Sequence, residues 1–281
     1  MYKFALIGYP LGHSLSPVIH QTAMEYCDML GSYELLPTPP EDLVSRIKYL
    51  KVNNYNGFNI TIPHKVPITF FLSSMDEVAD LAGAVNTVII DKDKELHGYN
   101  TDVHGFVSGL SESMKLLLKY QKAVIFGTGG ASRAVVIGLS QVGIKEIDFY
   151  SRDISKIDVL KKFYLEKFPQ IKFRFFQYTE KIDLSDTMIA VNTTPLGMLG
   201  KYAGVSPVEQ YVVDSLPDKG IVYDIVYNPV ETEFIKQAKK RNLKTVSGIN
   251  MLVNQGLKAF ELWTGKIVPA NIVTEAVLKR L

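Results

Sequence analysis

An apolar strand that runs directly into a glycine-rich loop is the feature of this sequence that most constrains its fold. Residues 123–126 are apolar, three glycines lie in the next four positions, and a helical pattern follows from 134 to 142. Strand, glycine turn and helix in this order are typical of a dinucleotide site, because the glycines allow close backbone approach to a pyrophosphate and the helix N-terminus attracts its charge. Ser132 departs from the third glycine of the G-x-G-x-x-G pattern but is small enough for close packing. We predict dinucleotide binding here, with a purely structural turn as the alternative.

Apolar runs alternate with helical patterns in two series, which predicts an α/β fold with a largely parallel sheet and an antiparallel edge. In the first series we expect strands at 4–7, 33–36, 57–62, 85–90 and 95–99, with helices from Ser16 and at 41–51. In the second we expect strands at 123–126, 147–150, 173–176, 188–191, 221–225 and 245–246, with helices at 134–142, 231–241, 250–264 and 270–281. We place the boundary between the series near Asp102, where a helix can bridge them.

Composition excludes several classes of protein. With 47% hydrophobic and 21% charged residues, the 281-residue chain is typical of a globular protein of one large domain or two ordinary ones. The net charge of +2 is too balanced for nucleic-acid binding by charge alone. Cys27 is the single cysteine, and the five histidines show no spacing of metal ligands. With no apolar run of about 18 residues and no convincing signal peptide, we expect a cytoplasmic protein with no metal, membrane or nucleic-acid partner.

Polar side chains gather where the predicted strands of the first half end. In open parallel sheets, ligands bind at that edge. Taken singly, each side chain also has a structural interpretation: Ser16 as the N-cap of a helix with Pro17 in its first position, Asn59 in a turn, Lys65 as a surface charge. The residues concerned are Ser14, Ser16, Asn59, Thr61, Lys65, Asn86 and Asp102.

Taken together, these motifs resemble the signature set of the shikimate dehydrogenase family. The segments HSLSP, NITIPHK, GAVNT, NTD, GTGGAS, NTTPLGM, YDIVYNP and GINMLVNQG follow that family's order and spacing over nearly the whole chain. The resemblance implies an NADP-dependent oxidoreductase that reversibly reduces 3-dehydroshikimate to shikimate in aromatic amino-acid (chorismate) biosynthesis. It also implies an N-terminal α/β substrate domain at 1–102, completed by the C-terminal helices at 248–281. A Rossmann domain for NADP is inserted at 103–247, with the site in the cleft.

The resemblance also implies residue roles. The catalytic pair would be Lys65 and Asp102. The substrate would be bound by Ser14, Ser16 and Tyr227 at its carboxylate and by Thr61, Asn86, Asp102 and Gln255 at its ring hydroxyls, with Asn59 close by. The cofactor would lie along Glu77, Gly127, Gly129, Gly130, Ala131, Thr193, Ile225 and Gly248.

Two chemical questions stay open at this point. A lysine ammonium beside a ring ketone can stabilise the developing oxyanion and donate a proton, so Lys65 is either proton donor or electrostatic anchor. At the tip of the second nucleotide-binding strand, Ser151, Arg152 and Lys156 favour the 2′-phosphate of NADP, whereas Asp153 would repel it unless it caps the next helix. Because two cations oppose one anion, we expect a preference for NADP.

Two alternatives remain. A quinate/shikimate dehydrogenase with relaxed use of NAD and NADP would carry the same motifs. A non-catalytic dinucleotide sensor would need the glycine loop but has no use for Lys65 and Asp102, so the presence of both argues against it. The expected partner is a small-molecule substrate, and a homodimer is possible.

Overall fold

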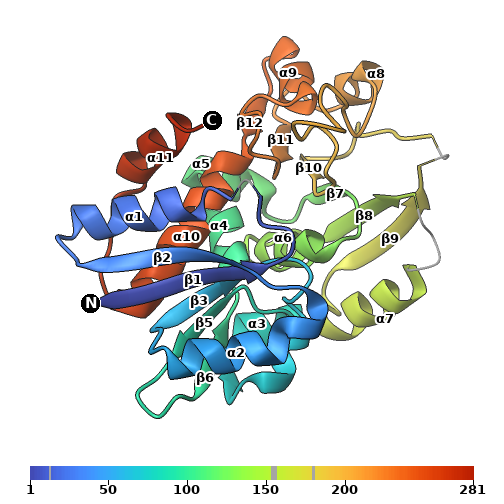
Figure 1. The fold of residues 1–281 in the computed structure, drawn as a ribbon. Helices are drawn as coiled ribbons and strands as arrows, with labels where there is room; N and C mark the ends of the chain where they lie inside the picture. The colour runs from blue at the N-terminus through green and yellow to red at the C-terminus, as the bar shows by residue number, and fades with distance from the viewer. Residues whose placement is uncertain (13, 153–156, 179–180) are drawn as a thin grey trace. The chain divides into compact units, whose positions relative to one another are not determined.

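The computed structural model describes residues 1–12, 14–152, 157–178 and 181–281, which fold into two compact units. The first unit comprises residues 1–105 and 253–281, and the second comprises residues 106–252. Figure 1 labels the elements of both. None of the helices in the described ranges is long and apolar enough to cross a membrane.

The first unit contains a mixed sheet with the strand order β2-β1-β3-β5-β6-β4. Its strands are β1 (Tyr2–Gly8), β2 (Gly31–Pro37), β3 (Gly57–Ile60), β4 (Ser74–Met75), β5 (Thr87–Ile90) and β6 (Leu96–Tyr99). β2, β1 and β3 run parallel, whereas β3, β5 and β6 pair antiparallel. The predicted antiparallel edge is therefore confirmed, and it places the end of β3 beside the start of β5.

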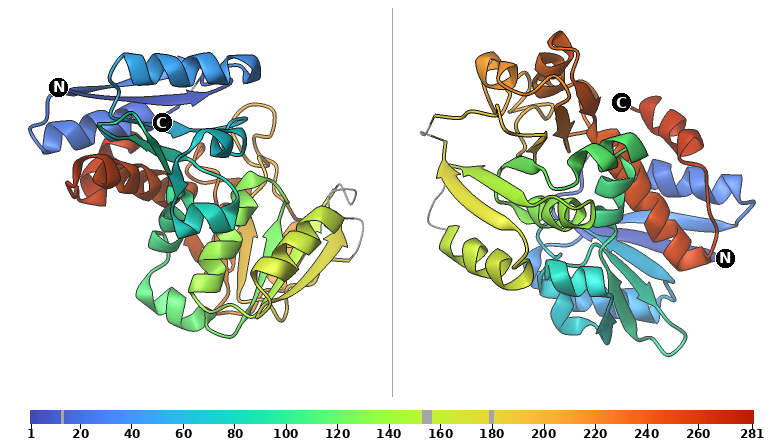
Figure 2. Two further views of the ribbon diagram at one scale, coloured as in Figure 1. Left: turned by 90° about the horizontal axis from the view of Figure 1, so that it is seen from below. Right: turned by 180° about the vertical axis from the view of Figure 1, so that it is seen from behind.

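Helices cover both faces of this sheet (Figure 2). The central strand β1 has buried apolar side chains on both sides, and each side must pack against another layer. Ala5 and Ile7 pack in one cluster with side chains of α2, while Phe4 stacks on Trp263 of α10 with ring centroids 4.5 Å apart. Successive side chains of a strand point to opposite faces, so one strand serves two cores. The helices of this unit are α1 (Ser16–Tyr26), η1 (Pro40–Asp42), α2 (Leu43–Val52), η2 (Pro67–Phe71), α3 (Glu77–Ala82) and α11 (Ala270–Leu278).

The start of α1 differs from the prediction. Ser16 is the first helical residue and Leu15 occupies the N-cap position, so the expected capping role of Ser16 is wrong. The oxygen of the Ser14 side chain instead accepts the backbone N–H of Ser16 at 3.2 Å. Because Ser14 accepts the N–H of Ser16, the helix starts one residue earlier than predicted.

The second unit contains a parallel sheet with the order β12-β11-β10-β7-β8-β9. Its strands are β7 (Lys122–Phe126), β8 (Glu146–Ser151), β9 (Lys172–Gln177), β10 (Ile189–Asn192), β11 (Ile221–Asp224) and β12 (Lys244–Val246). Its helices include α5 (Glu112–Leu118), α6 (Gly130–Gln141), α7 (Ile157–Lys167), α8 (Gln210–Asp214) and α9 (Glu233–Lys240). The strand order reverses between β7 and β10, and ligands of such sheets bind beyond the carboxyl ends of the strands at this switch point.

Two helices belong to both units by sequence. α4 (Thr101–Ser108) contains the first boundary, and α10 (Gly248–Thr264) contains the second. The fold class is the expected α/β architecture with two sheets. Strand 57–62 was predicted too long, since β3 ends at Ile60, and helix 41–51 begins as a turn of 3₁₀ helix.

Candidate functional site

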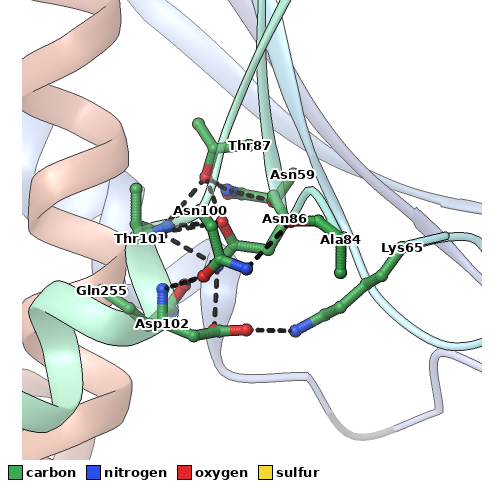
Figure 3. A network of polar contacts seen from close by, with 9 residues as sticks. All are labelled: Asn59, Lys65, Ala84, Asn86, Thr87, Asn100, Thr101, Asp102 and Gln255. Atoms are coloured by element: carbon green, nitrogen blue, oxygen red, sulfur yellow. Dashed lines mark hydrogen bonds and ion pairs between the residues drawn. The ribbon is translucent and has the colours of Figure 1, made fainter. Parts of the chain in front are cut away.

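Lys65 and Asp102 form an ion pair at the edge of the first sheet (Figure 3). Lys65 lies in the loop after β3, Asp102 lies in the first turn of α4, and Lys65 Nζ is 2.6 Å from Asp102 Oδ2. The lysine side chain is 29% exposed and the aspartate side chain 14% exposed, so the pair is partly solvated. The N-terminal end of α4 favours a carboxylate at this position.

Asn86 holds the second oxygen of the Asp102 carboxylate. Its Nδ2 donates to Asp102 Oδ1 at 2.9 Å, and its Oδ1 accepts the backbone N–H of Thr101 at 2.8 Å. The amide orientation is fixed by that backbone bond, and the side chain is 2% exposed. Gln255 of α10 lies nearby, with its Oε1 3.4 Å from Asn86 Nδ2. The structure therefore brings together four of the predicted residues: Lys65 and Asn86 contact the Asp102 carboxylate, and Gln255 contacts Asn86.

Ser14 and Ser16 also lie together. The Ser14 hydroxyl donates to Ser16 Oγ at 3.1 Å, and both side chains are half-buried. They meet because Ser14 folds over the first turn of α1, and not because the chain is extended as the two-residue spacing suggested. Two adjacent hydroxyls are suited to bind a carboxylate without a counter-charge.

Asn59, which the resemblance implied to lie close to the substrate-binding residues, hydrogen-bonds their neighbours. Its Oδ1 accepts from Tyr33 at 2.8 Å and lies 3.1 Å from Nε2 of His20. Its Nδ2 donates to Thr87 Oγ1 at 3.0 Å and to the carbonyl of Asn86 at 3.2 Å. An asparagine amide has two donors and two acceptor sites, so these four bonds use its whole capacity. Asn59 therefore supports its neighbours, and its role in substrate binding stays a prediction.

Sequence reasoning missed His20, Tyr33 and Thr87. Burial lowers the pKa of His20 to about 3, so its ring is neutral, and its stacking on Tyr33 places the ring centroids 4.3 Å apart. Thr87 lies directly opposite Asn59 in the antiparallel pair of β3 and β5. Strand register is the signal that identifies Thr87, and it is not contained in single motifs.

Two further predicted residues, Thr61 and Glu77, belong to the first unit. Thr61 directly follows β3 and is half-buried. Glu77 is the exposed first residue of α3, a helix capped by the Asp76 side chain. Among the residues that the structure describes, no three His, Cys, Asp or Glu side chains gather as a metal site.

The glycine loop of the second unit has the geometry that a pyrophosphate needs. Gly127 has φ +99°, and a Cβ there would lie 2.8 Å from Thr194 Cγ2, so only glycine fits. At Gly129 and Gly130, by contrast, a Cβ would find no described atom within 4 Å. α6 begins at Gly130 without a cap from any described side chain, so no such cap occupies the N–H groups of its first turn. The residues present therefore fit the diphosphate of a dinucleotide.

Ser132 and Thr193 hold this loop in shape. Ser132 is fully buried, and its hydroxyl donates to the carbonyl of Gly129 at 2.7 Å. Thr193 follows β10, is 8% exposed and donates to the carbonyl of Phe126 at 2.8 Å. The departure from a third glycine is thus compensated by a hydrogen bond, and Thr193 contributes through the loop backbone.

A buried carboxylate holds the chain after β11. Asp224 is fully buried and accepts from Asn192 Nδ2 at 2.9 Å, from the N–H of Val226 at 3.0 Å and from the Thr232 hydroxyl at 2.6 Å. Burial raises the pKa of Asp224 to about 6. The network fixes the loop of residues 225–228 relative to β10 and α9.

That loop carries two predicted residues. Ile225 and Tyr227 are both half-buried, and burial raises the pKa of Tyr227. Gly248 packs against the same loop so closely that a Cβ would lie 2.3 Å from the carbonyl oxygen of Ile225. Gly248 is therefore required for packing whether or not a cofactor lies beside it.

The residues predicted to select NADP lie at and just after the tip of β8. Ser151 ends β8, is 6% exposed and lies 3.2 Å from the Thr128 hydroxyl of the glycine loop. Arg152 is exposed. Lys156, the second predicted cation, and Asp153, the opposing anion, lie outside the described residues.

The comparisons with known proteins agree on one family. The models of the shikimate dehydrogenase substrate binding domain and the shikimate 5′-dehydrogenase C-terminal domain match residues 6–88 and 248–278. A shikimate dehydrogenase (NADP(+)) of Caldanaerobacter subterraneus subsp. tengcongensis is 39% identical over 274 residues, which are 98% of this chain and 95% of that protein.

Two solved structures are similar over the full chain. The shikimate 5-dehydrogenase of Thermus thermophilus, solved with NADP(H) and shikimate, has a TM-score of 0.85 and 33% identity and covers 100% of both chains. The 5-ketofructose reductase of Gluconobacter sp. has a TM-score of 0.89 and 28% identity, covering 100% of this chain and 99% of that one. The fold is thus shared by enzymes with different substrates, and the sequence identity over nearly the whole length decides between them: the chain belongs to the shikimate dehydrogenase family.

Proposed function

We propose that this protein is an NADP-dependent oxidoreductase that reversibly reduces 3-dehydroshikimate to shikimate. The observation that carries the proposal is the Lys65–Asp102 pair, 2.6 Å apart and held by the Asn86 amide at the edge of the first sheet. A ketone reduction needs a proton donor beside the carbonyl and hydrogen-bond partners for the neighbouring hydroxyls. This cluster supplies both kinds of group.

Lys65 acts on the carbonyl oxygen of the substrate. Its ammonium has three protons, one of which is directed to Asp102, so the others can bond the oxygen as negative charge develops. Asp102 keeps the ammonium in place and offers its remaining lone pairs to an adjacent ring hydroxyl. The kinetics of Lys65 variants decide whether Lys65 transfers the proton or only stabilises the charge.

The remaining substrate contacts come from the predicted hydroxyl and amide groups. The Ser14 and Ser16 hydroxyls, 3.1 Å apart, bind the carboxylate of the substrate with Tyr227. Thr61 and Gln255 bind ring hydroxyls. We propose that the substrate domain is formed by residues 1–102 and 248–281, which correspond to the first unit apart from a few residues at each boundary.

The dinucleotide domain in this proposal is residues 103–247, all of which lie in the second unit except 103–105. The N–H groups at the start of α6, on Gly130 and Ala131, bind the pyrophosphate, and Gly127 and Gly129 allow its close approach. Ser151 and Arg152 lie at the adenosine end, where the guanidinium pairs with a 2′-phosphate. Thr193, Ile225, Gly248 and Glu77 are the proposed neighbours of the ribose and nicotinamide. Bound NADPH supplies the hydride.

The direct test is an absorbance assay of NADP⁺ reduction with shikimate as the substrate. Parallel assays measure the oxidation of quinate with NADP⁺ and the reduction of 5-ketofructose with NADPH. The series is then repeated with NAD⁺ and NADH. We expect the highest kcat/KM with shikimate and NADP⁺. Comparable values for quinate or for NAD⁺ would support the relaxed quinate/shikimate dehydrogenase instead. Tight NADP binding in calorimetry without turnover of any of these substrates would identify the non-catalytic sensor.

The cytoplasmic location and a homodimer stay predictions. Cell fractionation tests the first, and light scattering of the purified protein tests the second.

A further inference from the structure

A continuous series of hydrogen bonds runs from Tyr33 on β2 to the carboxylate of Asp102. The Tyr33 hydroxyl donates to Asn59 Oδ1 at 2.8 Å, and Asn59 Nδ2 donates to Thr87 Oγ1 at 3.0 Å. The Thr87 hydroxyl donates to Asn86 Oδ1 at 3.1 Å, and Asn86 Nδ2 donates to Asp102 Oδ1 at 2.9 Å. Every donor in this series, which we term the polar chain, points toward the negative charge of Asp102.

Backbone groups fix the direction of the polar chain. Asn59 Nδ2 also donates to the carbonyl of Asn86 at 3.2 Å, so the Asn59 oxygen must face Tyr33. Asn86 Oδ1 also accepts the N–H of Thr101 at 2.8 Å, so the Asn86 nitrogen must face Asp102 (Figure 3). With both amides fixed in orientation, Thr87 Oγ1 accepts a hydrogen bond from Asn59, and its hydroxyl donates to Asn86 Oδ1 at 3.1 Å, with Thr101 Oγ1 slightly farther away at 3.3 Å.

The polar chain is shielded from water. Asn59, Thr87 and Asn86 are between 0% and 6% exposed. Aligned hydrogen bonds in such an environment polarise one another, which strengthens the last bond, the one to the carboxylate. Burial also raises the pKa of Tyr33, which therefore keeps its proton and stays a donor.

We propose that Tyr33 and Thr87 are positioning residues for the catalytic pair: the polar chain orients the Asn86 amide, which in turn orients the Asp102 carboxylate toward Lys65. The kinetic consequence rests on the proposed function. Tyr33 also hydrogen-bonds the Ser16 side chain, so its replacement can affect substrate binding as well. Thr87 lies in the middle of the polar chain. Its replacement therefore tests the positioning of the catalytic pair without removing the contact that Tyr33 makes with Ser16.

The kinetic test compares Thr87→Val, which removes the hydroxyl at nearly constant volume, with Thr87→Ser, which keeps it. Losing one link costs roughly a net hydrogen bond, so kcat should fall about 3- to 10-fold in Thr87→Val, with an unchanged KM for NADP⁺. Thr87→Ser should retain most of the wild-type kcat. Thermal denaturation checks that each variant is folded. A folded Thr87→Val variant with wild-type kcat would overturn the proposal.

A double-mutant cycle tests whether the two residues act along one path. If they do, Tyr33→Phe combined with Thr87→Val should lose little more than the more impaired single variant, whereas independent structural effects would multiply. Tyr55→Phe is the matched control, because the Tyr55 hydroxyl bonds Glu34 in the same unit, outside the polar chain. We expect Tyr55→Phe to keep the wild-type kcat. Multiplicative losses of kcat in the variant that combines Tyr33→Phe with Thr87→Val would contradict the polar chain.

A measurement without catalysis separates this proposal from the function. The ¹⁵N–¹H resonances of the Asn86 side chain, assigned with Asn86→Asp, should shift in Tyr33→Phe and stay in place in Tyr55→Phe. If these resonances shift while the wild-type protein fails to oxidise shikimate, the function is wrong and the polar chain stands. If shikimate is oxidised but the resonances stay in place in Tyr33→Phe, the polar chain is refuted.

Discussion

Replacing Lys65 by alanine removes the ammonium that lies 2.6 Å from Asp102 and should abolish most turnover while leaving the protein folded. Proton donation by a positioned group is worth about 100- to 10,000-fold in rate, or roughly 3–5 kcal/mol of transition-state stabilisation. The effect on stability should be far smaller. The side chains are 29% and 14% exposed, and a partly solvated pair contributes roughly 1 kcal/mol or less. Asp102 also keeps its bond from Asn86 at 2.9 Å.

The assay for this prediction is steady-state oxidation of shikimate with NADP⁺, with thermal denaturation as the check on folding. Lys48→Ala is a suitable control, since Lys48 is an exposed lysine on α2 of the same unit. Near wild-type kcat in a folded Lys65→Ala variant would remove Lys65 from the mechanism. Removing an electrostatic donor also costs about 100- to 1,000-fold, so Lys65→Arg separates the two roles, because it keeps the positive charge but not a readily transferable proton. Substantial activity in Lys65→Arg would favour the electrostatic anchor over the proton donor.

Three other predictions follow from the two units. Replacing Ser14 and Ser16 together by alanine should raise the KM for shikimate and leave NADP⁺ affinity nearly unchanged; an equal loss of NADP⁺ affinity would place the serines on the cofactor side. Arg152→Ala should weaken NADP⁺ far more than NAD⁺ in fluorescence titrations, and equal weakening would exclude a 2′-phosphate contact. Asp224 has its pKa raised to about 6, so it binds a proton in the folded state that the unfolded chain has lost, and its contribution to stability falls as the pH rises from about 4 through 6. Relative to wild type, Asp224→Asn should therefore gain roughly 3 kcal/mol of unfolding free energy between pH 4 and pH 7 in urea titrations; the same pH dependence in both proteins would contradict this account.

Asp224→Asn must be compared with wild type because His20 affects the pH dependence of stability in the opposite direction. Burial lowers the pKa of His20 to about 3, so the unfolded chain binds a proton there that the folded protein excludes. Its contribution to stability is present above the unfolded pKa and is lost as the pH falls below it. The two slopes oppose each other between about pH 4 and 6, and only a variant reveals either one.

The long apolar strands were predictable from the sequence, and the short helices were not. Strands such as β7 and β8 are buried on both sides and bounded by loops, so their apolar runs stand out. Helices α3, α5 and α8 have between 5 and 7 residues, too few turns for a clear 3.6-residue period. Ser16 misled the prediction because a serine before a proline is typical of an N-cap, and only the fold of Ser14 over the helix start changes that.

The site was predictable where motifs carry it and unpredictable where strand pairing creates it. Lys65 and Asp102 stand in distinctive segments, so the sequence suggested both. Tyr33 and Thr87 meet Asn59 only because β2, β1, β3 and β5 are neighbours in the order observed, with Asn59 opposite Thr87. A shift of one residue in that register would turn Thr87 to the other face of the sheet, and no local pattern specifies it.

The most direct measurement of the central claim is the fate of the hydride. The protein is incubated with 3-dehydroshikimate and NADPH that carries deuterium at both C4 positions of the nicotinamide, and the product is analysed by mass spectrometry and NMR. We predict shikimate with a single deuterium on the carbon that bore the ketone, formed at a rate that collapses in Lys65→Ala. Shikimate formed without deuterium, or no conversion by a folded wild-type protein that binds NADPH, would contradict the proposed function.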